Sequence, residues 1–159
     1  MSINVCNNNS MSAITSLPSG VGGGSLNLIT TSTASGASNV SFTSGIDSTY
    51  KEYIFKFIDI HMATSDASLT VNFRDGGSNY DATKTTTFFR AYHNEGGSAQ
   101  ALTYSTSADL AQSTSAQAII TSNGTDNDMS ASGTLHLFDP SNTTFVKHFL
   151  SNCHVYHKD

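Results

Sequence analysis

The chain has 159 residues, enough for one ordinary domain, and only 12% of them are charged, about half the usual share. Ser, Thr and Asn are abundant, while the strong surface-helix formers other than Ala are scarce, so the composition argues against an all-helical protein or a long coiled coil. The net charge of −5 without a basic cluster argues against nucleic-acid binding, and no apolar run approaches the roughly 20 residues that span a bilayer.

The first 25 residues differ from the rest in composition. Residues 1–9 lack the basic and apolar regions of a signal peptide, so we expect synthesis and retention in a cytoplasm. Residues 17–25 are rich in Gly and Ser and are flexible by composition. We therefore predict that residues 1–25 form an extended arm that becomes ordered on a neighbouring molecule, and that residues 26–159 form the folded domain. The candidate attachment residues of the arm are Ile14, Leu17, Pro18 and Val21.

From residue 26 the pattern is typical of strands. Short strands are predicted at 26–30 and 40–42. Residues 50–60 form the longest apolar run, with apolar side chains on both alternating faces, which predicts a central strand covered on both sides. Ser68 to Phe73 alternates cleanly, as a half-buried antiparallel strand does.

The next elements are separated by strong turn sequences. Asp75-Gly-Gly-Ser-Asn79 is a turn, and a strand over 83–92 follows it, so the sequence predicts a hairpin between residues 68–73 and 83–92. After another turn at 94–98, Leu102 and Tyr104 indicate a short strand, while residues 108–112 fit either one helical turn or a long loop.

The remaining strands are predicted at 118–120, 133–138, 144–150 and 153–156. In total the sequence predicts eight to ten short strands with turns every 8–12 residues. That spacing predicts an all-β, antiparallel β-sandwich that is jelly-roll-like.

The sequence contains no pattern that indicates catalysis or a cofactor. His154 and His157 would lie on opposite faces of one strand, and His136 and His148 lie on neighbouring candidate strands and could face each other. Three or four converging ligands would be needed for zinc, so we predict no metal site and assign the histidines to polar strand or interface positions.

The other candidate motifs are incomplete. Residues 75–81 and 126–128 are fragments of a calcium loop without its full set of oxygen ligands. No nucleophile elbow or phosphate-binding loop is present. Cys6 and Cys153 lie near opposite ends of the chain, and cytoplasmic synthesis favours two free thiols over a disulfide.

Four segments together resemble a known group of proteins. They are residues 44–61, 75–80, 91–95 and 133–149, and the resemblance runs from about residue 13 to the end. The chain is similar to small structural proteins encoded by tailed phages, especially phages of marine bacteria and cyanobacteria. Members occur as short proteins or as the C-terminal part of longer fibre-like chains. Met62 stands where relatives have Pro.

The resemblance implies a virion protein without catalytic residues, but it leaves the location on the particle open. One hypothesis is a capsid decoration or cement protein, a homotrimer that binds the major capsid protein or other virion proteins through its arm. It would be assembled into the virion in the host cytoplasm. The alternative is a tail-fibre or tail-tip module that binds a host-surface glycan. Exposed loops would carry the recognition residues Asn94, Glu95, Asn123, Asp126 and Asp128.

Overall fold

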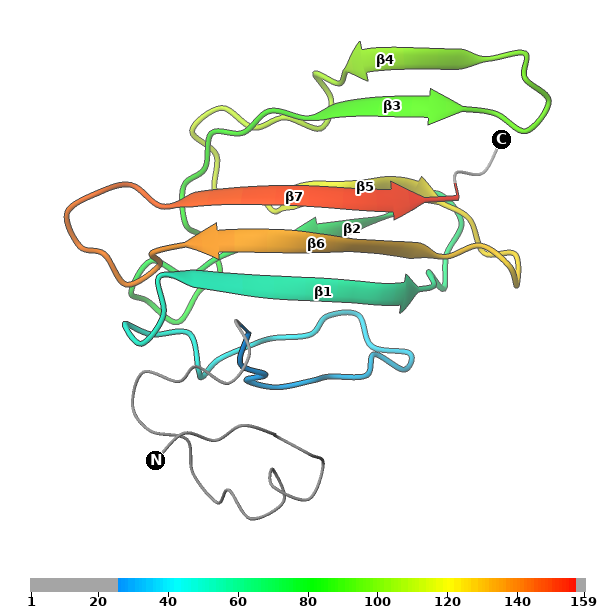
Figure 1. Ribbon diagram of the computed structural model, residues 1–159. Helices are drawn as coiled ribbons and strands as arrows, with labels where there is room; N and C mark the ends of the chain where they lie inside the picture. The colour runs from blue at the N-terminus through cyan, green and yellow to red at the C-terminus, as the bar shows by residue number, and fades with distance from the viewer. Residues whose placement is uncertain (1–25, 157–159) are drawn as a thin grey trace, which may run out of the picture. The chain divides into compact units, whose positions relative to one another are not determined.

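The computed structural model describes residues 26–156, and all of their regular structure is β (Figure 1). Two compact units are present, Met1–Val40 and Ser41–Asp159. In the described part of the first unit, residues 26–40 are exposed and form no strand. The strands predicted at 26–30 and 40–42 are therefore wrong, because a strand requires a ladder of hydrogen bonds to a neighbour. The first strand begins at Glu52.

The strands form three antiparallel sheets, which confirms the predicted all-β, antiparallel fold. The largest sheet has the order β1-β6-β7, β2 pairs with β5, and β3 pairs with β4. Residues 26–156 contain no helix that is long and apolar enough to cross a membrane. The strands are β1 (Glu52–Ile60), β2 (Ala67–Val71), β3 (Phe89–His93), β4 (Gln100–Tyr104), β5 (Gln117–Asn123), β6 (Ala131–Phe138) and β7 (His148–Val155).

The pairing of the strands is nested. β3 pairs with β4, β2 with β5 outside them, and β1 with β6 outside those, while β7 is added beside β6. A jelly roll nests its eight strands in the same manner. The predicted hairpin between residues 68–73 and 83–92 is wrong, because Leu69 instead lies opposite Ile120, where Ile120 is buried and Leu69 is partly buried.

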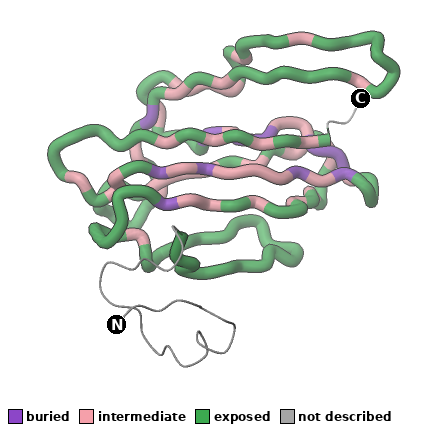
Figure 2. Tube along the Cα trace, in the orientation of Figure 1, coloured by how far each residue is buried: buried purple, intermediate pink, exposed green. Residues whose placement is uncertain are grey.

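The core lies between the three-stranded sheet and the β2–β5 pair. Tyr53, Leu135 and Leu137 of the larger sheet pack with Ile119 of β5, and partly buried residues of β2 and β7 surround them. Figure 1 shows β2 and β5 behind the larger sheet, and Figure 2 shows buried positions on the strands of both layers. This two-layer arrangement is the predicted β-sandwich.

The long apolar strand predicted to be central is an edge strand. β1 lies at the edge of its sheet and β6 lies in the middle. A bulge between Phe57 and Ile60 places Asp59 at a φ of 50° and shifts the register. Ile58 is 70% exposed, whereas Ile54 and Ile60 are partly buried, so the second apolar face of the strand is covered only in part.

β6 and β7 approach each other closely at Gly133. A Cβ atom at this position would lie 2.5 Å from the Asn152 carbonyl oxygen, 2.5 Å from the Cys153 Sγ and 2.7 Å from the Cys153 Cα. Glycine is thus required at the centre of the larger sheet because no side chain fits there.

Candidate interaction surfaces

The predicted attachment residues Ile14, Leu17, Pro18 and Val21 lie outside the described residues, as do Cys6 and His157. Cys153 is described, and its thiol is free. Its Sγ lies 3.4 Å from the Ser151 Oγ. The attachment role of residues 1–25 remains a prediction.

One of the predicted recognition residues is buried. Asn123 is 0% exposed and belongs to β5 rather than to a loop, so its prediction as an exposed residue is wrong. Its Nδ2 donates to the carbonyl of Ile60 over 3.3 Å, which ties β5 to the end of β1. Asp126 and Asp128 are exposed on the loop that follows. The backbone carbonyl of Asp126 lies 3.1 Å from the His61 Nε2.

The turn between β3 and β4 uses its polar groups internally. The Asn94 Nδ2 donates to the Ser98 Oγ over 2.9 Å, and its Oδ1 accepts from the Ala99 amide over 2.9 Å. Glu95 is exposed, and its Oε1 accepts a hydrogen bond of 2.7 Å from the Tyr156 hydroxyl, just beyond β7. These contacts fix the turn and join the tip of the hairpin to the end of β7.

The histidines on the larger sheet do not converge. His136 lies opposite Leu150 and His148 lies opposite Phe138, so the two histidines are diagonal neighbours on the outer face rather than a facing pair. The His136 Nδ1 lies 2.6 Å from a Glu52 carboxylate oxygen. Within residues 26–156 no group of three or more His, Cys, Asp or Glu side chains could hold a metal ion.

The apolar face of the hairpin formed by β3 and β4 was not predicted from the sequence. The register pairs Phe89 with Tyr104 and Ala91 with Leu102, which places these four side chains on one face. Phe89 is 69%, Leu102 75% and Tyr104 52% exposed. We call these four residues the ribbon face. The adjacent Phe88-Phe89 pair is the sequence feature that could have indicated this apolar face, but the same pair is equally compatible with buried core positions.

A buried polar network holds the base of this hairpin. The Lys84 Nζ donates to the Ala82 carbonyl over 2.6 Å and also to the Asn72 Oδ1. The Gln117 Nε2 donates to the Ala108 carbonyl over 2.8 Å, and its Oε1 accepts from the Thr86 hydroxyl. Burial lowers the pKa of Lys84, although nearby acidic groups oppose this effect. Because buried polar groups need fixed partners, the network sets where the hairpin leaves the sandwich.

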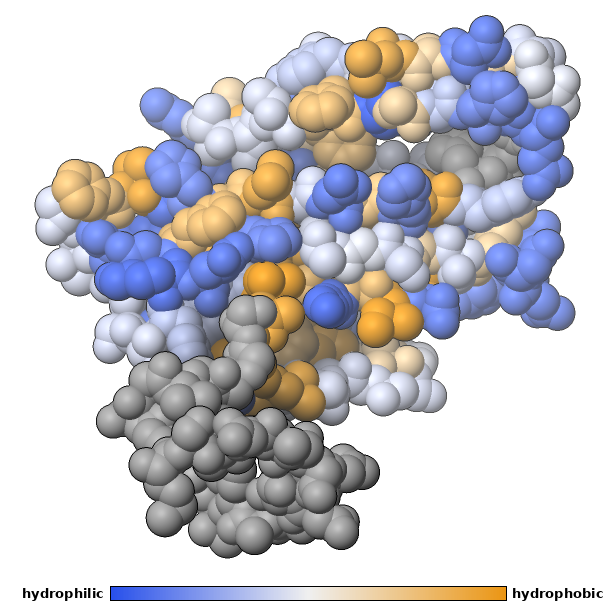
Figure 3. All heavy atoms as spheres, viewed as in Figure 1, coloured by the Kyte–Doolittle hydropathy of each residue, from blue (hydrophilic) through white to orange (hydrophobic). Residues whose placement is uncertain are grey.

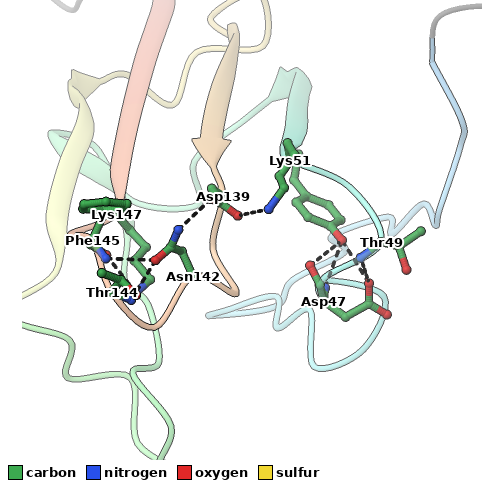
Figure 4. A network of polar contacts seen from close by, with 9 residues as sticks. Asp47, Thr49, Lys51, Asp139, Asn142, Thr144, Phe145 and Lys147 are labelled. Carbon is green, nitrogen blue, oxygen red and sulfur yellow. Dashed lines mark hydrogen bonds and ion pairs between the residues drawn. The ribbon is translucent and has the colours of Figure 1, made fainter.

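A second missed surface is the loop between β6 and β7 (Figure 4). The Asn142 Nδ2 donates to Asp139 over 2.9 Å, and its Oδ1 accepts from the amides of Thr144 and Phe145 over 2.7 and 2.9 Å. Lys51 beside β1 forms an ion pair of 3.0 Å with Asp139. The strand predicted over 144–150 is therefore correct only from His148, where β7 begins, and residues 144–147 belong to a loop with a defined conformation.

This polar network presents two apolar residues to solvent. Phe145 and Val146 are both exposed, and with Phe138 and His148 they line a hollow of 360 Å³. We call Phe145 and Val146 the loop tip. Figure 3 shows that apolar side chains gather in several places on the visible surface.

Exposed apolar side chains outnumber buried ones. Among residues 26–156, sixteen large hydrophobic residues are exposed, whereas seven hydrophobic residues are buried. Single exposed hydrophobic residues are ordinary, but contiguous patches mark contact sites with other molecules. The exposed apolar patches are therefore candidate contact sites for other molecules.

Comparisons of the chain with protein-family models, with curated proteins and with solved structures found no match.

Proposed function

We propose that the chain is a non-enzymatic structural protein of a phage virion, a capsid decoration or cement protein that attaches through residues 1–25. One observation carries the proposal: the described residues expose more large hydrophobic side chains than they bury. Such apolar surface is removed from water when neighbouring subunits cover it. Residues 44–61 and 133–149 resemble small phage structural proteins, which implies that the neighbouring subunits are those of a phage particle.

The mechanism needs no chemical step. A protein that binds the assembled shell, but not its dissociated subunits, stabilises the shell by its binding free energy. At a free concentration of about 100 times the dissociation constant, this amounts to about 2.7 kcal/mol per site. A homotrimer would place three attachment segments on one shell and multiply the effect through high effective concentration.

A tail-fibre or tail-tip module that binds a host-surface glycan is the second candidate. Tyr92 and Tyr104 are exposed aromatic residues on the β3–β4 hairpin, and sugar rings stack on such side chains. Phe89 and Leu102 share the face of Tyr104, and their apolar side chains favour a protein contact there instead.

The number of copies per particle separates the two candidates. A stained gel of purified particles, calibrated against the major capsid protein, should show hundreds of copies for a decoration protein, as the symmetry of a shell requires. About a dozen copies would identify a tail component, as expected from the low-order symmetry of a tail, and would contradict the decoration role.

Deletion of residues 1–25 tests the attachment. We expect the shortened protein to remain folded, because the core of the described residues is built from side chains between Ile46 and Cys153. It should no longer bind particles that lack the wild-type protein, as measured by co-sedimentation. If the shortened protein co-sediments as the full chain does, residues 1–25 are not the attachment segment.

A further inference from the structure

We infer that the ribbon face is the self-association surface of this protein and packs against the same face of a second copy of the chain. This inference rests on the proposed role as a structural subunit and names the surface through which the copies join. Phe89, Ala91, Leu102 and Tyr104 would meet their counterparts at the symmetry axis, whether two or three copies gather there.

The first support is that the hairpin has too little cover of its own. Every residue of β3 is exposed, and in β4 only Ala101 is partly buried. An isolated two-stranded hairpin is marginally stable at best in water, and it needs a further strand or a packing partner on its apolar face. The rigid base at Lys84 and Gln117 positions the hairpin, but it leaves the ribbon face in solvent.

The second support is the distribution of charge. The register places Phe89, Ala91 and His93 with Gln100, Leu102 and Tyr104, so this face carries no Asp, Glu, Lys or Arg. The only such residue in the two strands, Arg90, lies on the opposite face, with its guanidinium over the Tyr92 ring at 5.3 Å. One carboxylate lies beside the face, because the Tyr104 hydroxyl donates a hydrogen bond of 2.5 Å to the Asp109 Oδ2. Phe89, Ala91 and Leu102 carry no charge, so a chain with a net charge of −5 can bring this apolar centre against its own copy without opposing like charges there.

The third support is area. Taking about 200 Å² for each large side chain, the exposed parts of Phe89, Leu102 and Tyr104 supply about 400 Å². This is about half of the roughly 800 Å² that each partner buries in a stable interface. The flanking polar residues, His93 and Gln100, can supply part of the rim, which is the usual arrangement of an apolar centre and a polar border.

The test measures the oligomeric state of the full chain in solution. Sedimentation velocity over about 1 to 100 µM should show a closed oligomer for the wild type, whose population rises with concentration. Leu102→Lys should raise the dissociation constant by at least about 100-fold, because it buries an unpaired charge. Ile58→Lys on β1 is the matched control, because it also replaces an exposed aliphatic side chain, 70% exposed, with Lys, but outside the ribbon face. It should leave the dissociation constant unchanged.

Two further measurements test the inference in case Leu102→Lys fails to fold. Phe89→Ser on the same face should weaken association in the same direction as Leu102→Lys. In the wild type, amide hydrogen exchange of residues 89–104 should slow by about 10-fold or more as the concentration rises, because association protects the hairpin. The exchange measurement tests self-association through the hairpin even if circular dichroism shows that both variants are unfolded.

Three results would overturn the inference. They are a wild-type protein that is monomeric at the highest concentration, an oligomer that folded Leu102→Lys leaves intact, and equal weakening by Ile58→Lys. Dissociation by a change at Val146 alone would assign the interface to the loop tip instead. Particle binding is measured separately, so an oligomer that does not bind particles would refute the decoration role and leave the ribbon interface standing.

Discussion

Asp139 shows how a single residue organises a surface. It follows β6 at a φ of 42°, its amide donates to the Lys51 carbonyl over 2.7 Å, and its carboxylate accepts from Asn142 and Lys51. The hydrogen bond from Asn142, and then that from Lys51, lowers the pKa of Asp139 below 3.8. The ionised carboxylate therefore supports the loop that presents Phe145 and Val146.

Asp139→Asn should lower stability at neutral pH. Because the pKa of Asp139 is lower in the folded than in the unfolded chain, its stabilising contribution is present above the ordinary value of 3.8 and is lost as the pH falls through the folded value. The wild type should thus melt at a higher temperature than the variant at pH 7, with a smaller difference near pH 3. Asn tolerates a positive φ, so the change isolates the charge. An equal difference at both pH values would contradict this account.

At the scale of the elements, Gly133 allows β6 and β7 to approach each other closely. Gly133→Ala would drive its Cβ into the backbone of β7 at Asn152 and Cys153. We expect a loss of about 1–3 kcal/mol in the free energy of unfolding, since forced overpacking costs about this much. Urea denaturation measures it, with Gly77→Ala as the control, where the nearest atom to a new Cβ is 3.9 Å away. Equal stability of both variants would mean that β7 shifts without cost.

The strands could be predicted from the sequence far better than their partners. Alternation located β2, and the Leu102–Tyr104 pattern located β4. The turn at 75–79 suggested a hairpin, yet β2 pairs with β5, because pairing depends on which apolar faces can be buried together and not on the nearest turn.

The candidate surfaces were harder to predict than the strands. An apolar pair such as Phe145-Val146 has the same pattern in a loop as in a strand, and only the polar network of Asn142 and Asp139 distinguishes them. The ribbon face was missed for a related reason: Phe89 and Leu102 fit a buried strand equally well, and their exposure depends on tertiary packing.

For the whole molecule, the proposed self-association predicts that stability depends on assembly. Seven hydrophobic residues are buried among those described, and the proposed interface would remove further apolar surface from water. Under this proposal, folding and assembly are linked.

The melting temperature should therefore depend on protein concentration. A 100-fold increase should raise it by about 3 to 6 °C, given the size of the chain and the mass-action gain from association. Leu102→Lys should abolish this dependence, and Ile58→Lys should keep it. Differential scanning calorimetry at matched scan rates provides the measurement, and a constant wild-type value across concentrations would show that the folded chain is self-sufficient.

The nested pairing has a consequence during synthesis. β1 ends at Ile60, but its partner β6 begins at Ala131, so the ribosome must add about 70 residues before the outer pair can close. At about 5–20 residues per second, the apolar strand at Tyr53–Ile60 waits several seconds without a partner. Contacts between residues so distant in the sequence slow folding, and the unpaired apolar strand of the nascent chain is prone to aggregation until β6 has been made.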